Sequence, residues 1–238
     1  MRKVESIAEL RTICQASKKK ASTTLFCARF KTVSIYITKV LLYTPVTANQ
    51  VSVLRVLVGI GAGVLFVFGS YWYSIAGALV LFLSYALDFV DGEIARYRGT
   101  TSVKGEYYDD LGHDIIYPVL FICMSFGVYR NFHDVLIFAF GCSAALAYLL
   151  QRVEIRIPSW NSERGNTKPS TGIASRFMVR IISIKEKVFY IVDPVLVAVI
   201  LGAIFDGMAI VLILFGIAYP AFYIARIVQN RVATSPDS

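Results

Sequence analysis

The chain has 238 residues, of which 56% are apolar and only 17% are charged, and its mean hydropathy is +0.62. A soluble domain carries about 25% charged residues, so the composition excludes an ordinary soluble domain, and the high apolar fraction excludes intrinsic disorder. The net charge is +8, but a nucleic-acid-binding protein as basic as this would not also be as apolar. We therefore expect an integral membrane protein with basic surfaces on one side, and no nucleic-acid partner.

Residues 1–45 are predicted to form a basic cytoplasmic tail that ends in a helix. Residues 1–20 are polar and mixed in charge, so we expect no cleavable signal peptide. In the stretch that follows, apolar residues recur every three or four positions. They are Phe26, Phe30, Val33, Ile37 and Leu41. This periodicity fits an amphipathic helix in the membrane interface, and a basic tail without that role explains the charge equally well.

Six stretches are apolar enough to cross a bilayer, and we predict an all-α integral membrane bundle of six transmembrane helices over residues 46–228. The stretches are Val51–Ser70, Tyr71–Leu87, Ile115–Tyr129, Val135–Leu150, Val188–Phe205 and Gly207–Ala225. Several are shorter than the roughly 20 residues that a span needs. The second and third reach full length if their helices continue through the polar residues between them. Thr47 or Asn49 is expected to cap the first span.

The distribution of Lys and Arg predicts the orientation. Of the 24 basic residues, 23 lie in segments that six spans would place on the same side of the membrane. Basic residues accumulate on the cytoplasmic side of membrane proteins. We therefore expect a multi-pass protein with both termini in the cytoplasm, including a short tail at residues 229–238.

Acidic residues are concentrated between the second and third spans, at the predicted cytoplasmic surface. Seven of the 16 lie there: Asp88, Asp91, Glu93, Glu106, Asp109, Asp110 and Asp114. Carboxylates at the membrane surface are costly unless they are paired or bind a metal ion, so they are functional candidates. A solvated acidic loop is the alternative, but this side of the membrane otherwise collects basic residues.

The spacing of these residues predicts a metal site. Asp88 and Asp91 are three residues apart on one helix face, and Asp109 and His113 are four apart on the next. Packing these faces together would gather three carboxylates and an imidazole. The carboxylates repel one another, and a hard divalent cation would offset that repulsion. Oxygen ligands suit Mg²⁺ or Mn²⁺, and Mg²⁺ often completes its shell with phosphate oxygens. We therefore expect a phosphorylated or diphosphate substrate.

The segment from Asp88 to His113 resembles the signature of the CDP-alcohol phosphatidyltransferases, D-x2-D-G-x2-A-R-x8-G-x3-D-x3-D. Seven of its eight fixed positions match with every spacing intact, and they are Asp88, Asp91, Gly92, Ala95, Arg96, Gly105 and Asp109. The segment Thr44–Arg55 is also similar to the one that leads into that family's first span. The eighth position, an Asp in the family, is His113 in this chain.

The resemblance implies that Asp88, Asp91 and Asp109 bind Mg²⁺ or Mn²⁺, and that the residue at the eighth position takes a proton from an acceptor hydroxyl. A neutral His is a suitable general base near pH 7, so His113 is the first candidate. Asp114 is the second candidate, since Asp110 and Asp114 repeat the four-residue spacing on a neighbouring face. A relative that has lost activity is the third possibility.

The resemblance also implies the reaction and its partners. A CDP-linked lipid donor, such as CDP-diacylglycerol, would pass its phosphatidyl group to a small hydroxyl-bearing acceptor and release CMP. The family also suggests a homodimer. Gly92, Ala95 and Gly105 would make room for the nucleotide, and Arg96 would either pair with phosphate or flank the membrane. Four further basic residues would bind an acceptor phosphate or flank the membrane: Arg152, Arg156, Arg176 and Arg180.

Two other membrane functions use clustered carboxylates. A divalent-cation transporter would hold its ion near the middle of the bilayer and often contains internal repeats, whereas these acids lie at one surface and no repeat is evident. An intramembrane prenyltransferase would be expected to have a second Asp-rich motif, and residues 151–238 contain only scattered acids. The sequence therefore favours the phosphatidyltransferase.

Overall fold

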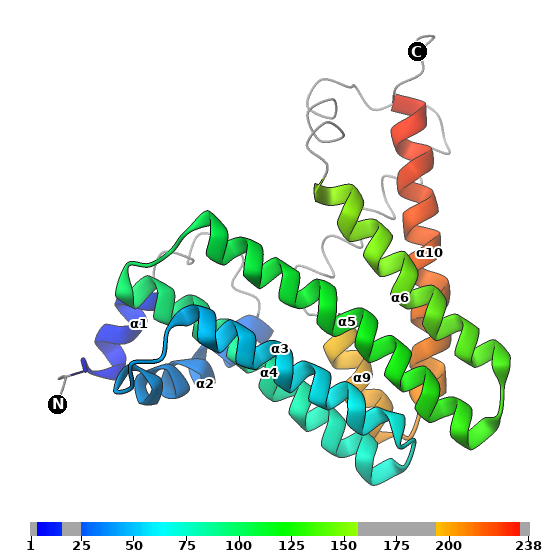
Figure 1. Cartoon of the computed structure of the whole chain (residues 1–238), viewed down its shortest axis with the longest axis horizontal. Helices are drawn as coiled ribbons and strands as arrows, with labels where there is room; N and C mark the ends of the chain where they lie inside the picture. The colour runs from blue at the N-terminus through cyan, green and yellow to red at the C-terminus, as the bar shows by residue number, and fades with distance from the viewer. Residues whose placement is uncertain (1–3, 16–24, 157–193, 234–238) are drawn as a thin grey trace.

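The computed structural model describes residues 4–15, 25–156 and 194–233, and all regular secondary structure in these ranges is α-helical (Figure 1). The helices are α1 (Ile7–Gln15), α2 (Leu25–Leu42), α3 (Ala48–Val67), α4 (Tyr71–Arg98), α5 (Val103–Phe132), α6 (Val135–Arg156), α9 (Pro194–Ile204) and α10 (Met208–Ala233). Five of them are long and apolar enough to span a membrane, namely α3, α4, α5, α6 and α10, and α9 is a shorter apolar helix. The predicted all-α membrane bundle is confirmed. Residues 188–193 of the fifth predicted span lie outside the described residues.

Local capping sets the ends of the helices around the acidic segment. At the start of α3, Thr47 Oγ1 accepts a hydrogen bond from the Gln50 amide at 3.3 Å, and Gln50 Oε1 accepts one from the Thr47 amide at 2.8 Å. This capping box makes Thr47 the cap. Helix α4 ends at Gly99, whose φ of 64° is left-handed, and α5 begins after Ser102. Both helices therefore continue through the acidic residues, as predicted.

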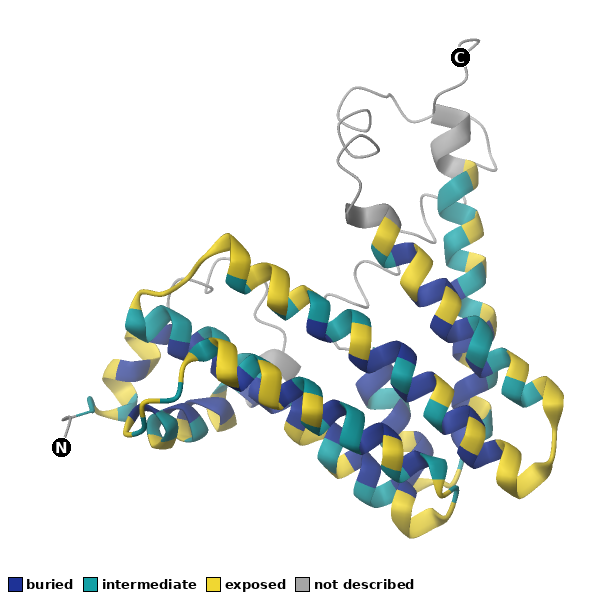
Figure 2. Ribbon diagram, in the orientation of Figure 1, coloured by how far each residue is buried: buried dark blue, intermediate teal, exposed yellow. Residues whose placement is uncertain are grey.

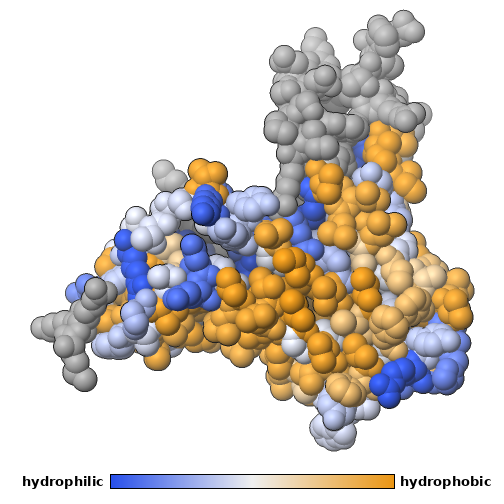
Figure 3. Space-filling view, in the orientation of Figure 1, coloured by the Kyte–Doolittle hydropathy of each residue, from blue (hydrophilic) through white to orange (hydrophobic). Residues whose placement is uncertain are grey.

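The long helices bury an apolar core and also expose apolar faces. Figure 2 shows buried residues along the lines where the helices meet, and the centre of the core includes Leu120, Phe121 and Met124 of α5. On the outside, α3 leaves Leu57 62% exposed and α4 leaves Leu79 66% exposed. Figure 3 shows a broad hydrophobic surface over the middle of the bundle. A surface of this kind is typical of helices that face lipid, and it identifies the chain as a multi-pass membrane protein.

The N-terminal helices α1 and α2 pack against α4 at the end of the bundle that carries the acidic residues (Figure 1). Sequence periodicity did not reveal α1, in which Leu10 and Cys14 are buried. Burial raises the pKa of the Cys14 thiol to about 11, so this cysteine is a neutral packing residue.

Helix α2 forms where it was predicted. The side chains turned toward the bundle are Phe30, Ser34, Ile35, Thr38 and Leu42, whereas Val33 is 48% exposed. Ser34 and Thr38 hydrogen-bond to the buried Glu93 of α4, so polar contacts attach this face to the bundle. The position of α2 in the membrane interface stays a prediction.

Candidate active site

Two carboxylates and an imidazole from α4 and α5 converge at the end of the bundle beside α1 and α2. Asp88 of α4 and Asp109 and His113 of α5 each place one potential metal-binding atom within 4.8 Å of the other two. All three residues are partly buried. This is the convergence of the two helix faces that their spacing predicted, and it is a possible site for a divalent cation.

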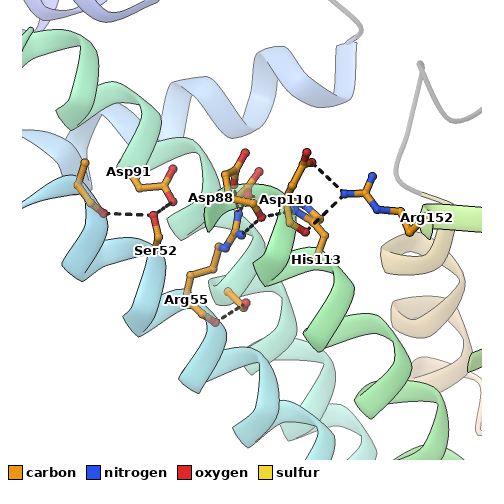
Figure 4. A network of polar contacts seen from close by, with 10 residues as sticks. Ser52, Arg55, Asp88, Asp91, Asp110, His113 and Arg152 are labelled. Carbon is orange, nitrogen blue, oxygen red and sulfur yellow. Dashed lines mark hydrogen bonds and ion pairs between the residues drawn. The ribbon is translucent and has the colours of Figure 1, made fainter. Parts of the chain in front are cut away.

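A buried arginine lies between the two carboxylates, and the sequence-based hypothesis did not include it in the site. Arg55 of α3 is 2% exposed. It forms an ion pair with Asp88, and its Nη1 and Nη2 donate to Asp109 Oδ1 at 2.6 Å and to the Asp109 backbone carbonyl at 2.7 Å. Figure 4 shows Arg55 pointing from α3 toward Asp88 and His113. The sequence places Arg55 inside an apolar span, and this position was the signal that it faces a buried partner.

The surroundings of Arg55 leave room for its guanidinium and hold its backbone. Gly112 of α5 lies against Arg55, and a β-carbon at this position would overlap the guanidinium. Ser84 of α4 donates a hydrogen bond to the Arg55 carbonyl at 2.9 Å. A side chain at position 112 would therefore displace the guanidinium, and the ion-pair geometry depends on all three helices.

Asp91 lies one turn along α4 from Asp88 but has a different partner. Its side chain is 6% exposed, and its Oδ2 accepts a hydrogen bond from Ser52 Oγ of α3 at 2.7 Å (Figure 4). The structure does not include Asp91 in the group formed by Asp88, Asp109 and His113. The predicted role of Asp91 as a metal ligand therefore stays a prediction.

The orientation of His113 follows from its position one turn after Asp109. Its Nδ1 lies 3.2 Å from the Asp109 backbone carbonyl, and a carbonyl can only accept a hydrogen bond. The contact therefore favours the tautomer with the proton on Nδ1, which leaves the lone pair on Nε2. Nε2 lies 3.7 Å from Asp88 Oδ1, so the basic nitrogen of the ring faces the carboxylates.

Asp110 and Asp114 lie on the next face of α5 and pair with Arg152 of α6 (Figure 4). Arg152 Nε donates to Asp114 Oδ1 at 2.6 Å, and Arg152 Nη2 donates to Asp110 Oδ1 at 2.9 Å. Two carboxylates therefore engage Arg152, and its predicted role, as an acceptor-phosphate ligand or a membrane flank, stays a prediction. The side chain of Arg156 and residues 176 and 180 lie outside the described part of the chain.

The residues predicted to surround a nucleotide do not all face the carboxylates. Arg96 Nε donates to the Cys14 carbonyl of α1 at 2.5 Å. A β-carbon at Gly92 would lie 3.1 Å from Arg96 Nη1, so the arginine lies over this glycine. Gly105 is in the first turn of α5, where its amide donates to Ser102 Oγ at 3.1 Å, and Ala95 is partly buried. Their predicted roles stay predictions.

A small, partly open pocket adjoins the convergent carboxylates. Asp88, His113 and Arg55 form its polar wall. The remaining wall is mostly apolar and is formed by Leu81, Ser84, Tyr85, Ile116, Tyr117 and Leu196. The pocket therefore has one charged wall and one mostly apolar wall.

The model of one protein family matches residues 45–217, and that family is the CDP-alcohol phosphatidyltransferases. The chain belongs to this family. Its members transfer phosphatidyl groups in phospholipid synthesis, so the predicted enzyme class and family are confirmed. No curated protein sequence matches the chain.

The fold of this phosphatidyltransferase is similar to that of phosphatidylinositol phosphate synthase (PgsA1) from Mycobacterium tuberculosis. The structure of PgsA1 with CDP-DAG bound has a TM-score of 0.60 at 17% identity, over 86% of this chain and 96% of that one. The structure with manganese and citrate has a TM-score of 0.58 at 19% identity, over 86% and 90% of the two chains. The apo form of PgsA1 has a TM-score of 0.54 at 19% identity, over 84% of this chain and 96% of that one. The likeness shows a common fold.

The residues of this phosphatidyltransferase fit a hard divalent cation. Asp88 and Asp109 each bring a carboxylate oxygen to the same place, and both oxygens pair with Arg55. Two carboxylates so close together repel each other, and a cation held by Asp88 and Asp109 would offset this repulsion with the ligand type that Mg²⁺ and Mn²⁺ prefer. His113 is a less suitable ligand for these ions, which favour oxygen.

Proposed function

We propose that this protein transfers a phosphatidyl group from a CDP-linked lipid, with CDP-diacylglycerol as the first candidate, to an acceptor hydroxyl and releases CMP. The observation that carries the proposal is the convergence of Asp88, Asp109 and His113 beside a cavity with one polar and one apolar wall. The PgsA1 structures that share the fold contain CDP-DAG in one case and manganese in another, which supports a CDP-linked lipid donor and a divalent cation.

In the proposed reaction, the acceptor oxygen bonds to the phosphorus on the lipid side of the diphosphate. The bond from that phosphorus to the bridging oxygen breaks, and CMP leaves with the bridging oxygen. His113 Nε2 takes the hydroxyl proton as the new bond forms, since this nitrogen carries the lone pair and faces the site. A bound Mg²⁺ or Mn²⁺, held by Asp88 and Asp109 with Asp91 as a further predicted ligand, supplies positive charge to the diphosphate oxygens.

Arg55 of α3 pairs with Asp88 and Asp109 and holds the two carboxylates in place, and its positive charge offsets their repulsion. Gly92, Ala95, Arg96 and Gly105 remain the proposed nucleotide-binding residues, on the basis of the family signature. We place the site and both termini on the cytoplasmic side, because the basic residues gather there. The identity of the acceptor alcohol and the homodimer stay predictions.

The experiment that tests this function is CMP release from CDP-diacylglycerol by the purified protein, with Mn²⁺ or Mg²⁺ and a panel of hydroxyl acceptors. We expect release with one of the acceptors, and loss of release when EDTA removes the metal ion. An inactive relative would release no CMP with any acceptor. Release that persists in EDTA would contradict the metal-dependent reaction.

A pair of neighbouring variants identifies the general base. We expect His113→Ala to lower the kcat of CMP release about 100-fold or more, because a positioned base contributes about 10² to 10⁴ in rate. Asp114→Asn should lower kcat far less, because Asp114 pairs with Arg152 on the side facing α6. Steady-state kinetics measures both effects.

Titration of Mn²⁺ by electron paramagnetic resonance separates a base from a metal ligand. We expect His113→Ala to bind Mn²⁺ as the unmodified chain does. Loss of Mn²⁺ binding in this variant would make His113 a ligand, and a larger loss of kcat in Asp114→Asn would make Asp114 the base.

A further inference from the structure

Glu93 belongs to the acid-rich segment, yet it faces away from the convergent carboxylates. It is 1% exposed, and its carboxylate accepts three hydrogen bonds from the N-terminal helices. The donors are Gln15 Nε2 of α1 at 2.6 Å, Ser34 Oγ of α2 at 2.7 Å and Thr38 Oγ1 of α2 at 2.6 Å. A buried carboxylate is costly unless donors surround it. The network is therefore a specific connection between α4 and the two helices that precede the first span.

The following residues of α4 continue this connection. Arg96 bonds to the last turn of α1, the Tyr97 hydroxyl donates to Glu5 Oε2 at 2.5 Å, and Arg98 Nη2 donates to the Thr44 carbonyl at 3.0 Å. Beneath these polar contacts, apolar side chains of α1, α2 and α4 form a shared core that includes Leu10, Ile35, Val90 and Ile94. The end of α4 is thus attached to three successive N-terminal segments.

The same turns of α4 carry the candidate metal ligands on the other side. A helix turns by about 100° per residue, so Glu93 lies about 140° around the helix from Asp88 and about 160° from Asp91. A helix is stiff over this distance, and a shift of one face carries the opposite face with it. Reaction rates are sensitive to such shifts, because a displacement of about 1 Å can cost about 100-fold.

We propose that Glu93 is a positioning residue, through which α1 and α2 hold the acidic end of α4 so that Asp88 meets Asp109 and His113 of α5. The inference rests on the proposed function for its effect on the reaction. It assigns no contact with substrate or metal to Glu93. The N-terminal helices thereby have a part in setting the geometry of the site, through the hydrogen bonds that Gln15, Ser34 and Thr38 donate to Glu93.

The test compares Glu93→Ala and Glu93→Gln in the full chain. We expect Glu93→Ala to lower the kcat of CMP release about tenfold, to raise the Mn²⁺ concentration for half-maximal activity, and to leave the KM for CDP-diacylglycerol nearly unchanged. Glu93→Gln should stay within about threefold of the unmodified chain, because its amide keeps the shape. Its oxygen can still accept from Gln15 and Ser34, and the Thr38 hydroxyl can turn to accept from its nitrogen. Titration of Mn²⁺ by electron paramagnetic resonance should show weaker binding in Glu93→Ala only.

Leu10→Ala is the matched control, because Leu10 is fully buried in the same N-terminal core but makes none of the hydrogen bonds to Glu93. It should lower the melting temperature while Mn²⁺ binding and kcat stay unchanged. If Glu93→Ala does not fold, the double variant Ser34→Ala/Thr38→Val removes the two α2 donors and should show the same shifts.

Two results would overturn the positioning role: Mn²⁺ binding and kcat of Glu93→Ala equal to those of the unmodified chain, or shifts of the same size in Leu10→Ala. Absence of CMP release from the unmodified chain would instead contradict the proposed function. In that case the Mn²⁺ titration of Glu93→Ala still decides the role of Glu93.

Discussion

Asp88→Asn and Asp109→Asn should each lower the kcat of CMP release about 1,000-fold, which is about 4 kcal/mol of transition-state stabilisation. Each change removes one negative charge from the pair of carboxylates that α4 and α5 bring together, and the amide that replaces it is a weak ligand for a hard cation. The purified variants should also bind Mn²⁺ more weakly than the unmodified chain. Steady-state kinetics and Mn²⁺ titration by electron paramagnetic resonance measure the two effects.

Glu106→Gln is the control for this loss of activity. Glu106 is exposed and lies in the first turn of α5, the helix that carries Asp109. It changes the net charge by the same amount without touching the site, so its kcat should be close to that of the unmodified chain. An Asp88→Asn variant that retains full activity, or a Glu106→Gln variant as impaired as Asp88→Asn, would show that the convergent carboxylates are not the metal site.

Arg55→Met should destabilise the folded protein by about 3 kcal/mol and remove most of its activity. The change leaves Asp88 and Asp109 close together without the cation that they share, and breaking a buried ion pair from one side costs about 3–5 kcal/mol. The expected destabilisation is at the lower end of this range because the Asp109 side chain is 45% exposed and its charge is partly solvated. The measurement is thermal unfolding in detergent. Added Mn²⁺ should restore more stability to Arg55→Met than it adds to the unmodified chain, since it supplies charge between the same carboxylates.

Arg130→Met provides the comparison for this variant, because Arg130 is exposed at the other end of α5. The melting temperature of Arg130→Met should not change.

Gly112→Ala tests the same ion pair without altering a charge, since the added methyl group would displace the Arg55 guanidinium. Gly61→Ala meets no atom within 4 Å and should be tolerated. Equal stability of Arg55→Met and the unmodified chain would contradict a structural role for this ion pair.

The helices, and the candidate residues that α4 and α5 carry, could be named from the sequence because they depend on local properties. Hydropathy located the spans, and the three- and four-residue spacings placed Asp88 with Asp91 and Asp109 with His113 on common helix faces. The cap at Thr47 and the continuation of α4 and α5 through the acidic residues followed from residues a few positions away. The family signature has the same local character, since it lies within two helices that are adjacent in sequence.

The sequence could not predict how the seven clustered acids divide among partners, because those partners lie far along the chain. Glu93 binds a residue 78 positions away, Asp91 binds one 39 positions away, and Arg152 reaches Asp114 across 38 positions. Helical periodicity shows which residues share a face, but it does not show which other helix that face meets.

By itself, therefore, the sequence determined a membrane bundle with its basic residues biased to one side and an acidic signature suited to a divalent cation. Only the tertiary structure decided that Asp88, Asp109 and His113 converge, that Arg55 lies between the carboxylates, and that Glu93 faces the N-terminal helices. The physical reason is that a buried charge must find its partners among whichever side chains helix packing brings near. Packing is a property of the whole chain, whereas spacing is a property of one helix.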